Sequence, residues 1–207
     1  MIVFIGNFVP ESSYNSFKCY SNIFESLANV IVKSSHIAKN SYIVFIPGPE
    51  DFSLFSGFPK HPIIDTVINP LKKKLPNIIN ATNPCRLSVF GKEFVFFREN
   101  LNKKLSRNSV VKCRDISKNK EYYVHTVLAQ GSLAPVDLTV SPLIWHHAQA
   151  MTILPLPQYL VLADVVEDFY MTNNTTTVVN PGNFTKDFSF CVIFPLKNLV
   201  EPCKINI

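Results

Sequence analysis

Two short runs of apolar residues near the start of the chain contain no alternating polar positions. They occupy residues 2–5 (Ile-Val-Phe-Ile) and 42–46 (Tyr-Ile-Val-Phe-Ile). Continuous runs of this length are typical of strands that are covered on both faces, as in a parallel sheet. Between them, across residues 16–34, apolar residues recur at intervals of three and four, which predicts an amphipathic helix. The order strand, helix, strand predicts a βαβ crossover with parallel strands.

The middle of the chain changes from alternating to helical spacing. Apolar and β-branched runs at 86–90 and 93–97 are joined across Gly91-Lys92, which predicts a β-hairpin with its turn at these two residues. Directly after it, Leu101 and Leu105 stand four apart, which predicts a helix.

The segment before this hairpin, residues 52–74, contains three prolines. Pro59, Pro62 and Pro70 lack a backbone N–H and clash with the preceding turn of a helix. We therefore expect an irregular segment without a long helix.

The second half of the chain continues with strands and short helices. Residues 122–131 predict a helix closed by Gly131, and Ser141-Pro142 predicts the N-cap and first position of another. Three more strands are expected, at residues 159–163, 176–179 and 188–194. The pattern as a whole predicts an α/β fold.

Composition excludes several classes of protein. The chain has 207 residues, of which 47% are hydrophobic and 17% charged, as in a globular domain. The five cysteines include no C-x-x-C pair, so neither a disulfide framework nor a zinc knuckle is indicated. No run approaches the roughly 20 apolar residues of a membrane span. A reducing compartment is expected.

Positive charge is concentrated in one segment. The net charge of the chain is +5, but residues 98–120 hold eight basic and two acidic residues, a local charge of +6. This segment is either a solvated face or a surface for the DNA backbone or an acidic partner. No aromatic residues are interleaved as a stacking platform, so sequence-specific or single-strand recognition is not expected. The candidate surface residues are Arg98, Lys103, Lys104, Arg107, Lys112 and Arg114.

Several short motifs, in this order along the chain, resemble the B subunits of eukaryotic replicative DNA polymerases. The helix that follows Arg98-Glu99 favours the epsilon branch of that family over the alpha and delta branches. The matching segments are 5–8 (Ile-Gly-Asn-Phe), 46–51 (Ile-Pro-Gly-Pro-Glu-Asp), 83–86 (Asn-Pro-Cys-Arg), 97–101 (Phe-Arg-Glu-Asn-Leu), 125–131, Ser141-Pro142 with Trp145, 154–157 (Leu-Pro-Leu-Pro), 162–164 (Leu-Ala-Asp) and 180–182 (Asn-Pro-Gly).

The resemblance implies a calcineurin-like phosphoesterase sandwich, with two mixed sheets flanked by helices, that is degenerate and lacks its N-terminal strand. Residues 1–207 would be the C-terminal part of that domain. There is no room for the oligonucleotide-binding-fold or N-terminal helical domain that other members carry.

Active phosphoesterases of this fold hold two metal ions with Asp, His and Asn at successive strand ends. Here the matching positions have lost most of these side chains, so we expect a vestigial pocket with no metal, no cofactor and no catalytic residue. The lining turns would be Gly6, Asn7, Pro47, Gly48, Pro49, Glu50, Asp51 and Asp164.

Four other candidates have more ordinary explanations. His146 and His147 are adjacent, and neighbouring helical residues point about 100° apart and do not chelate one ion together. His125 lies in a mostly apolar stretch and suits a hydrogen-bonded structural role. Cys85 follows a proline, has no obvious base and suits packing. The pair Glu50-Asp51 lacks a partner nucleophile and suits a turn cap.

The function implied by the resemblance is that of a non-catalytic accessory subunit. It would hold the cysteine-rich C-terminal region of the epsilon catalytic subunit in the nucleus, with weak duplex DNA contact at most, no membrane and no small-molecule substrate. The alternatives are a B subunit of the alpha or delta enzyme, or an active metallophosphoesterase with relocated ligands.

Overall fold

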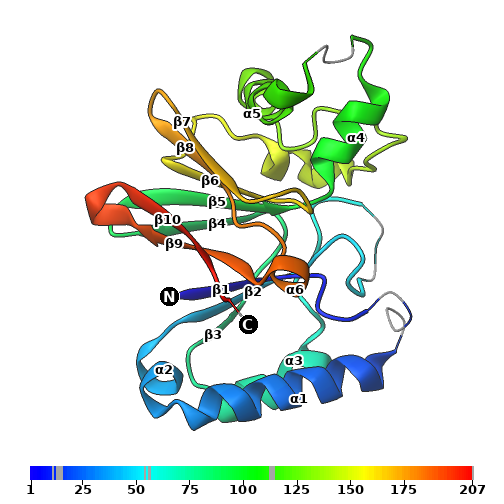
Figure 1. The fold of residues 1–207 in the computed structure, drawn as a ribbon. Helices are drawn as coiled ribbons and strands as arrows, with labels where there is room; N and C mark the ends of the chain where they lie inside the picture. The colour runs from blue at the N-terminus through cyan, green and yellow to red at the C-terminus, as the bar shows by residue number, and fades with distance from the viewer. Residues whose placement is uncertain (11, 13–15, 54, 56, 112–114, 207) are drawn as a thin grey trace. The chain divides into compact units, whose positions relative to one another are not determined.

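The chain forms two compact units, seen in a computed structural model that describes residues 1–10, 12, 16–53, 55, 57–111 and 115–206 (Figure 1). Unit 1 comprises residues 1–56 and 60–83, and unit 2 comprises residues 57–59 and 84–207. The assignment of residues 1–207 to one domain stays a prediction.

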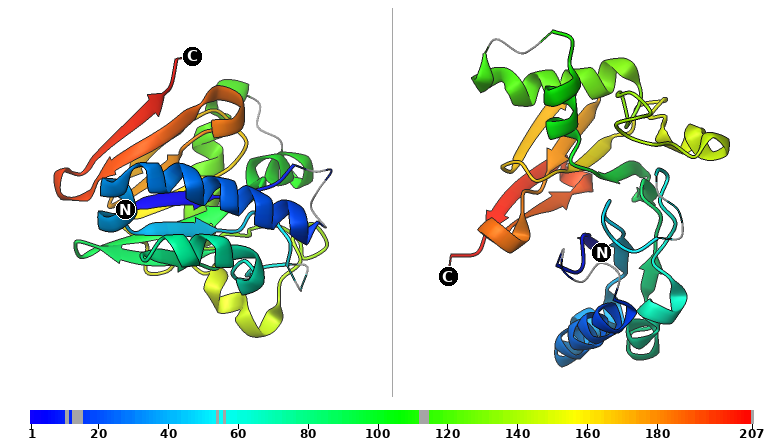
Figure 2. Two further views of the ribbon diagram at one scale, coloured as in Figure 1. Left: turned by 90° about the horizontal axis from the view of Figure 1, so that it is seen from below. Right: turned by 90° about the vertical axis from the view of Figure 1, so that its right-hand side faces the viewer.

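Unit 1 is a three-stranded parallel sheet in the order β1-β2-β3 with three helices. Figure 1 and the right-hand view of Figure 2 show α1 and α3 on the same face of this sheet. The predicted βαβ crossover is therefore confirmed. The elements are β1 (Ile2–Ile5), α1 (Phe17–Lys33), α2 (Ser35–Asn40), β2 (Ile43–Ile46), α3 (Asp65–Lys74) and β3 (Ile78–Asn80).

Helix α1 begins where the sequence predicts it, because the Ser16 side chain accepts a hydrogen bond from the Cys19 amide and caps the first turn. Its buried stripe, with Phe24 fully covered, packs with Phe45 of β2 into an aromatic cluster at a ring separation of 5.7 Å. All four residues of β2 are buried, as predicted. Strand β1 is only half-buried, because it lies at the edge of the sheet within the described chain.

The expectation of an irregular segment at 52–74 is wrong for its last part. Helix α3 runs through Pro70. An interior proline costs about 3 kcal/mol, but the helix buries Val67, Ile68 and Leu71 in the core, and each such side chain contributes about 1.5–3 kcal/mol. Tertiary packing therefore outweighs the local cost.

Unit 2 is built on a mixed five-stranded sheet in the order β4-β5-β6-β8-β7. Strands β5, β6 and β8 are parallel, and β4 and β7 pair antiparallel at the edges. The strands are β4 (Cys85–Val89), β5 (Lys92–Arg98), β6 (Tyr159–Ala163), β7 (Phe169–Asn173) and β8 (Thr176–Asn180).

The predicted hairpin is confirmed with its turn one residue earlier. Val89 pairs with Lys92, so the turn residues are Phe90 and Gly91, with φ of 51° and 73°. Positive φ at both positions is the type I′ geometry that matches the twist of the flanking strands.

Two helices of unit 2, α4 (Leu101–Asn108) and α5 (Asn119–Gln130), share one hydrophobic core with its sheet. Leu101 of α4 and Val124, Val127 and Leu128 of α5 pack on strand residues such as Leu160 in one core. Gly131 closes α5 in the left-handed region, at φ 63°, as predicted. The helical elements are α4 (Leu101–Asn108), η2 (Ile116–Lys118), α5 (Asn119–Gln130) and η3 (Trp145–Met151).

Ser141-Pro142 does not begin a helix, which corrects the prediction. The Phe58 amide donates to the Pro142 carbonyl, and the Ile144 amide donates to the Phe58 carbonyl. This short bridge holds residues 142–144 extended, so η3 starts only at Trp145.

The chain ends in a separate two-stranded hairpin, which follows a short helix. These elements are α6 (Phe184–Asp187), β9 (Ser189–Phe194), η4 (Pro195–Lys197) and β10 (Leu199–Lys204). Within the described chain, no helix combines the length and apolar character that crossing a membrane requires.

The α/β class, with sheets flanked by helices, is confirmed. The sheet of unit 1 is parallel across its described strands instead of mixed, because β1, β2 and β3 are joined by helical crossovers.

Candidate functional site

In unit 1 the turns after β1 and β2 meet around Asp51. This side chain is 3% exposed. Its Oδ1 accepts hydrogen bonds from the Phe8 amide at 2.8 Å and the Tyr20 hydroxyl at 3.1 Å, and its Oδ2 accepts one from the Gly48 amide at 2.7 Å. The Tyr20 hydroxyl in turn accepts from the Phe52 amide at 2.9 Å. Both oxygens of the carboxylate are thus used to join two turns and α1.

The two turns approach each other closely enough to require glycine. A Cβ on Gly6 would lie 2.0 Å from Asp51 Oδ2, and one on Gly48 would lie 2.1 Å from Asn7 Oδ1. The Asn7 side chain also accepts a hydrogen bond from the Glu50 amide at 3.2 Å. The sequence-predicted residues Gly6, Asn7, Gly48, Glu50 and Asp51 are therefore brought together, but into a closed arrangement.

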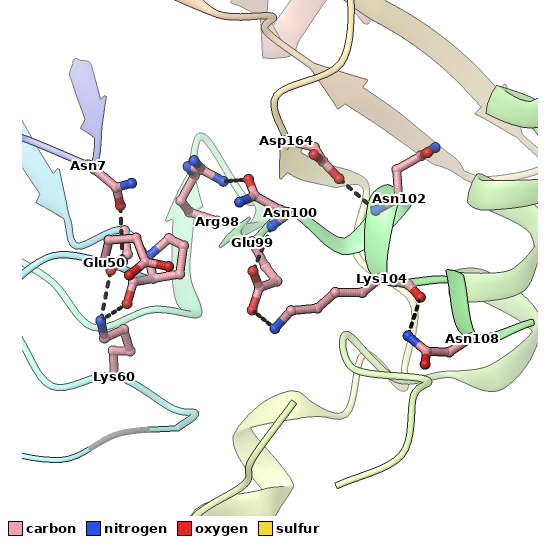
Figure 3. A network of polar contacts seen from close by, with 12 residues as sticks. Asn7, Glu50, Lys60, Arg98, Glu99, Asn100, Asn102, Lys104, Asn108 and Asp164 are labelled. Atoms are coloured by element: carbon pink, nitrogen blue, oxygen red, sulfur yellow. Dashed lines mark hydrogen bonds and ion pairs between the residues drawn. The ribbon is translucent and has the colours of Figure 1, made fainter. Parts of the chain in front are cut away.

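Lys60 closes the same turn from the other side. Its ammonium donates to the carbonyls of Gly48 and Asp51, both at 3.0 Å, and to that of Pro49 (Figure 3). Lys60 is 6% exposed. Its sequence context does not predict this role, because a single lysine in a proline-rich segment carries no pattern.

The chemistry available at these turns is limited. Burial raises the pKa of Asp51, while the Phe8, Gly48 and Tyr20 donors and the Lys60 charge oppose that shift. No cluster of three or more His, Cys, Asp or Glu side chains that could hold a metal ion occurs among the described residues. Asp51 acts here as a structural acceptor, which agrees with the predicted turn cap.

Asp164 lies in unit 2, where it follows β6. Its Oδ2 accepts from the Asn102 amide at 2.8 Å and its Oδ1 from the Val165 amide at 2.7 Å (Figure 3). Burial, together with the nearby Asp164 carboxylate, raises the pKa of the Tyr123 hydroxyl of α5. Because Asn100, the residue before α4, makes no side-chain cap, Asp164 supplies an acceptor for the first turn of that helix from a distant strand. Burial raises the pKa of Asp164.

Two residues of the predicted basic surface are held within unit 2. Arg98 is 8% exposed and donates to Asn100 Oδ1 at 3.0 Å and the Ala163 carbonyl at 3.3 Å. Lys104 pairs with Glu99 at 2.7 Å (Figure 3). Arg98 therefore does not belong to an exposed face, which corrects that part of the prediction.

Of the remaining basic candidates, Lys103 and Arg107 are exposed on α4. Lys112 and Arg114 lie outside the described residues. We call Lys103 and Arg107 the exposed basic surface.

The other candidate residues do not form a catalytic arrangement. Burial raises the pKa of the Cys85 thiol to about 11, so it is not a thiolate nucleophile. His125 Nδ1 lies 3.4 Å from the Asn173 amide nitrogen in an exposed contact. His146 and His147 are exposed on η3.

Comparison with known proteins decides the family. A family model described as the B subunit of DNA polymerase alpha/epsilon matches residues 1–171. The chain belongs to this family.

Similar proteins in the B-subunit family come from animals, plants and fungi. DNA polymerase epsilon subunit 2 of Bos taurus is 35% identical over 99% of this chain, and the DNA polymerase epsilon B subunit of Arabidopsis thaliana is 32% identical over 97%. The corresponding protein of Saccharomyces cerevisiae is 27% identical over 80%. The chain spans about 39% of the length of the first two relatives and 30% of the third.

Among solved structures, an archaeal phosphodiesterase aligns with 99% of this chain and 84% of its own, at 10% identity and a TM-score of 0.48. A TM-score of this size does not establish a shared fold. The calcineurin-like arrangement of the two sheets stays a prediction.

Proposed function

We propose that this chain is a non-catalytic accessory subunit of DNA polymerase epsilon. The observation that carries the proposal is the family match over residues 1–171, together with relatives named as epsilon subunits in animals, plants and fungi. Its role would be to hold the cysteine-rich C-terminal region of the catalytic subunit, in the nucleus.

The closed turns of unit 1 support the non-catalytic part of this proposal. A dimetal phosphoesterase site needs open carboxylate and imidazole ligands. Here the Asp51 carboxylate accepts three hydrogen bonds, and Lys60 places a positive charge beside the same turn. An added cation would have to displace these contacts.

Co-purification tests the accessory role. In three separate experiments, the chain is co-expressed with the cysteine-rich C-terminal region of the epsilon, the alpha or the delta catalytic subunit. We expect a stoichiometric complex with the epsilon region and none with the other two. Binding to the alpha or delta region instead would assign the chain to another polymerase, and binding to none would contradict the proposed role.

The exposed basic surface is proposed to make weak contact with duplex DNA or an acidic partner. The double substitution Lys103→Ala/Arg107→Ala should lower the slope of log affinity against log salt for a DNA duplex by about 1–2, since each lost phosphate contact contributes about 0.9. Fluorescence anisotropy at several salt concentrations measures this.

The control is Lys33→Ala/Lys39→Ala, which removes the same charge from helices of unit 1. If both double variants change the slope equally, binding follows net charge alone. If the unmodified chain does not bind duplex even at low salt, the surface is a solvated face.

A further inference from the structure

The turn after β2 presents an unusual set of acceptors to one side chain. Three backbone carbonyls, those of Gly48, Pro49 and Asp51, converge on the Lys60 ammonium. All three carbonyls lie within residues 48–51, so one turn supplies all three of these acceptors for the Lys60 ammonium. Lys60 is 6% exposed, so bulk water does not replace these contacts.

A buried group of converging carbonyls needs a positive partner. Each carbonyl carries a partial negative charge, and a buried acceptor without a donor destabilises the folded state. The buried carboxylate of the same turn, that of Asp51, adds to the negative potential, and the Lys60 charge in turn lowers the pKa of Asp51. Rings of backbone carbonyls are also the ligands that proteins use for monovalent cations.

The backbone of Lys60 is fixed so that its side chain reaches the turn. The Lys60 amide donates to the Asn83 carbonyl at 2.7 Å, and the Asn83 amide donates to the Lys60 carbonyl at 3.0 Å. The Asn83 side chain donates to the Pro47 carbonyl at 2.9 Å, which ties the same bridge to the start of the turn. Asn83 is fully buried. Lys60 is therefore positioned by two backbone hydrogen bonds as well as by its own ammonium.

We propose that the turn formed by residues 47–51 is a monovalent-cation site that the chain fills with its own Lys60 ammonium. The site would take a small monovalent cation, such as ammonium, once the lysine side chain is removed. A divalent ion does not suit it, because the carbonyls of Gly48, Pro49 and Asp51 are neutral and the Asp51 carboxylate already accepts three hydrogen bonds. This inference does not depend on the accessory role.

Rescue by small cations tests the proposal. Lys60→Ala should lower the thermal unfolding midpoint, and ammonium chloride should restore part of the loss. Tetramethylammonium chloride at the same concentration should not, because it is too large and donates no hydrogen bond. Lys60→Met, which fills the space without a charge, should lose stability and gain nothing from ammonium.

Lys72→Ala is the control, since Lys72 is partly exposed and pairs with the surface residue Asp65. It should respond equally to both salts. Equal stabilisation of Lys60→Ala by both salts would overturn the proposal.

A second measurement on the unmodified chain covers the case in which Lys60→Ala does not fold. In a sample labelled with ¹⁵N on lysine side chains, the Lys60 ammonium protons should exchange with water much more slowly than those of exposed lysines. Exchange as fast as that of Lys72 would show that the ammonium is not enclosed by the turn, and would overturn the proposal.

Discussion

Replacing Asp51 with asparagine is expected to lower the free energy of unfolding by about 3 kcal/mol. The carboxylate accepts hydrogen bonds at both oxygens, from the Phe8 amide and Tyr20 hydroxyl at one and from the Gly48 amide at the other. An asparagine side chain has one oxygen and one amide group. In either orientation its N–H atoms face at least one backbone N–H at about 3 Å, so a donor meets a donor.

Chemical denaturation measures this loss of stability, and two variants with smaller expected losses serve as comparisons. Tyr20→Phe removes one donor and leaves the Phe52 amide without its acceptor, so it should cost about 1 kcal/mol. Glu50→Gln changes the neighbouring exposed carboxylate and should fall within about 0.5 kcal/mol of the unmodified chain. A loss for Asp51→Asn no larger than that for Glu50→Gln would show that the network around Asp51 is not formed.

Replacing Asp164 with alanine is the second large expected effect, at about 2–4 kcal/mol. The change removes the acceptor of the Asn102 and Val165 amides. The first lies in the first turn of α4 and the second directly after β6. The N-terminus of α4 then has no side-chain acceptor in its first turn, since Asn100 supplies none.

Hydrogen exchange separates this local effect from a general loss of stability. In Asp164→Ala the Asn102 amide should exchange faster under conditions where the central residues of β6 remain protected. Glu167→Gln is the control, because Glu167 pairs with Lys120 at the surface. If the Asn102 amide keeps its protection in Asp164→Ala, Asp164 is not the acceptor that fixes α4.

The sequence predicts the parts of this fold that local chemistry decides. The Ser16 hydroxyl caps the start of α1, and Gly131 ends α5 because glycine adopts a positive φ without steric cost. The prediction fails at Pro70, because the burial of Val67, Ile68 and Leu71 is a tertiary effect that a proline count does not include. It also fails at Ser141-Pro142, where a bridge to Phe58 uses the backbone groups that a helix would need.

In the candidate site, too, the sequence indicates some residues and leaves out those that only tertiary contacts bring to it. The motifs indicate both turns and Asp51, because missing metal ligands can be read from residue types. They do not indicate Tyr20 or Lys60, which lie 31 and 9 residues from Asp51 along the chain. A tyrosine on an amphipathic helix and a lysine between prolines carry no spacing that links them to the turn. Charge alone places Arg98 on the surface, whereas its contacts with Asn100 and Ala163 bury it.

We expect the turns after β1 and β2, which the Asp51 and Lys60 hydrogen bonds close, to hold no catalytic metal. The direct test is metal analysis of the purified chain after incubation with Mn²⁺ and removal of the excess, together with an assay for hydrolysis of bis(p-nitrophenyl) phosphate. We expect no stoichiometric metal on the chain and no hydrolysis above that of Asp51→Asn, assayed under conditions in which that variant is folded. Two bound metal ions per chain, with hydrolysis that Asp51→Asn abolishes, would contradict this expectation.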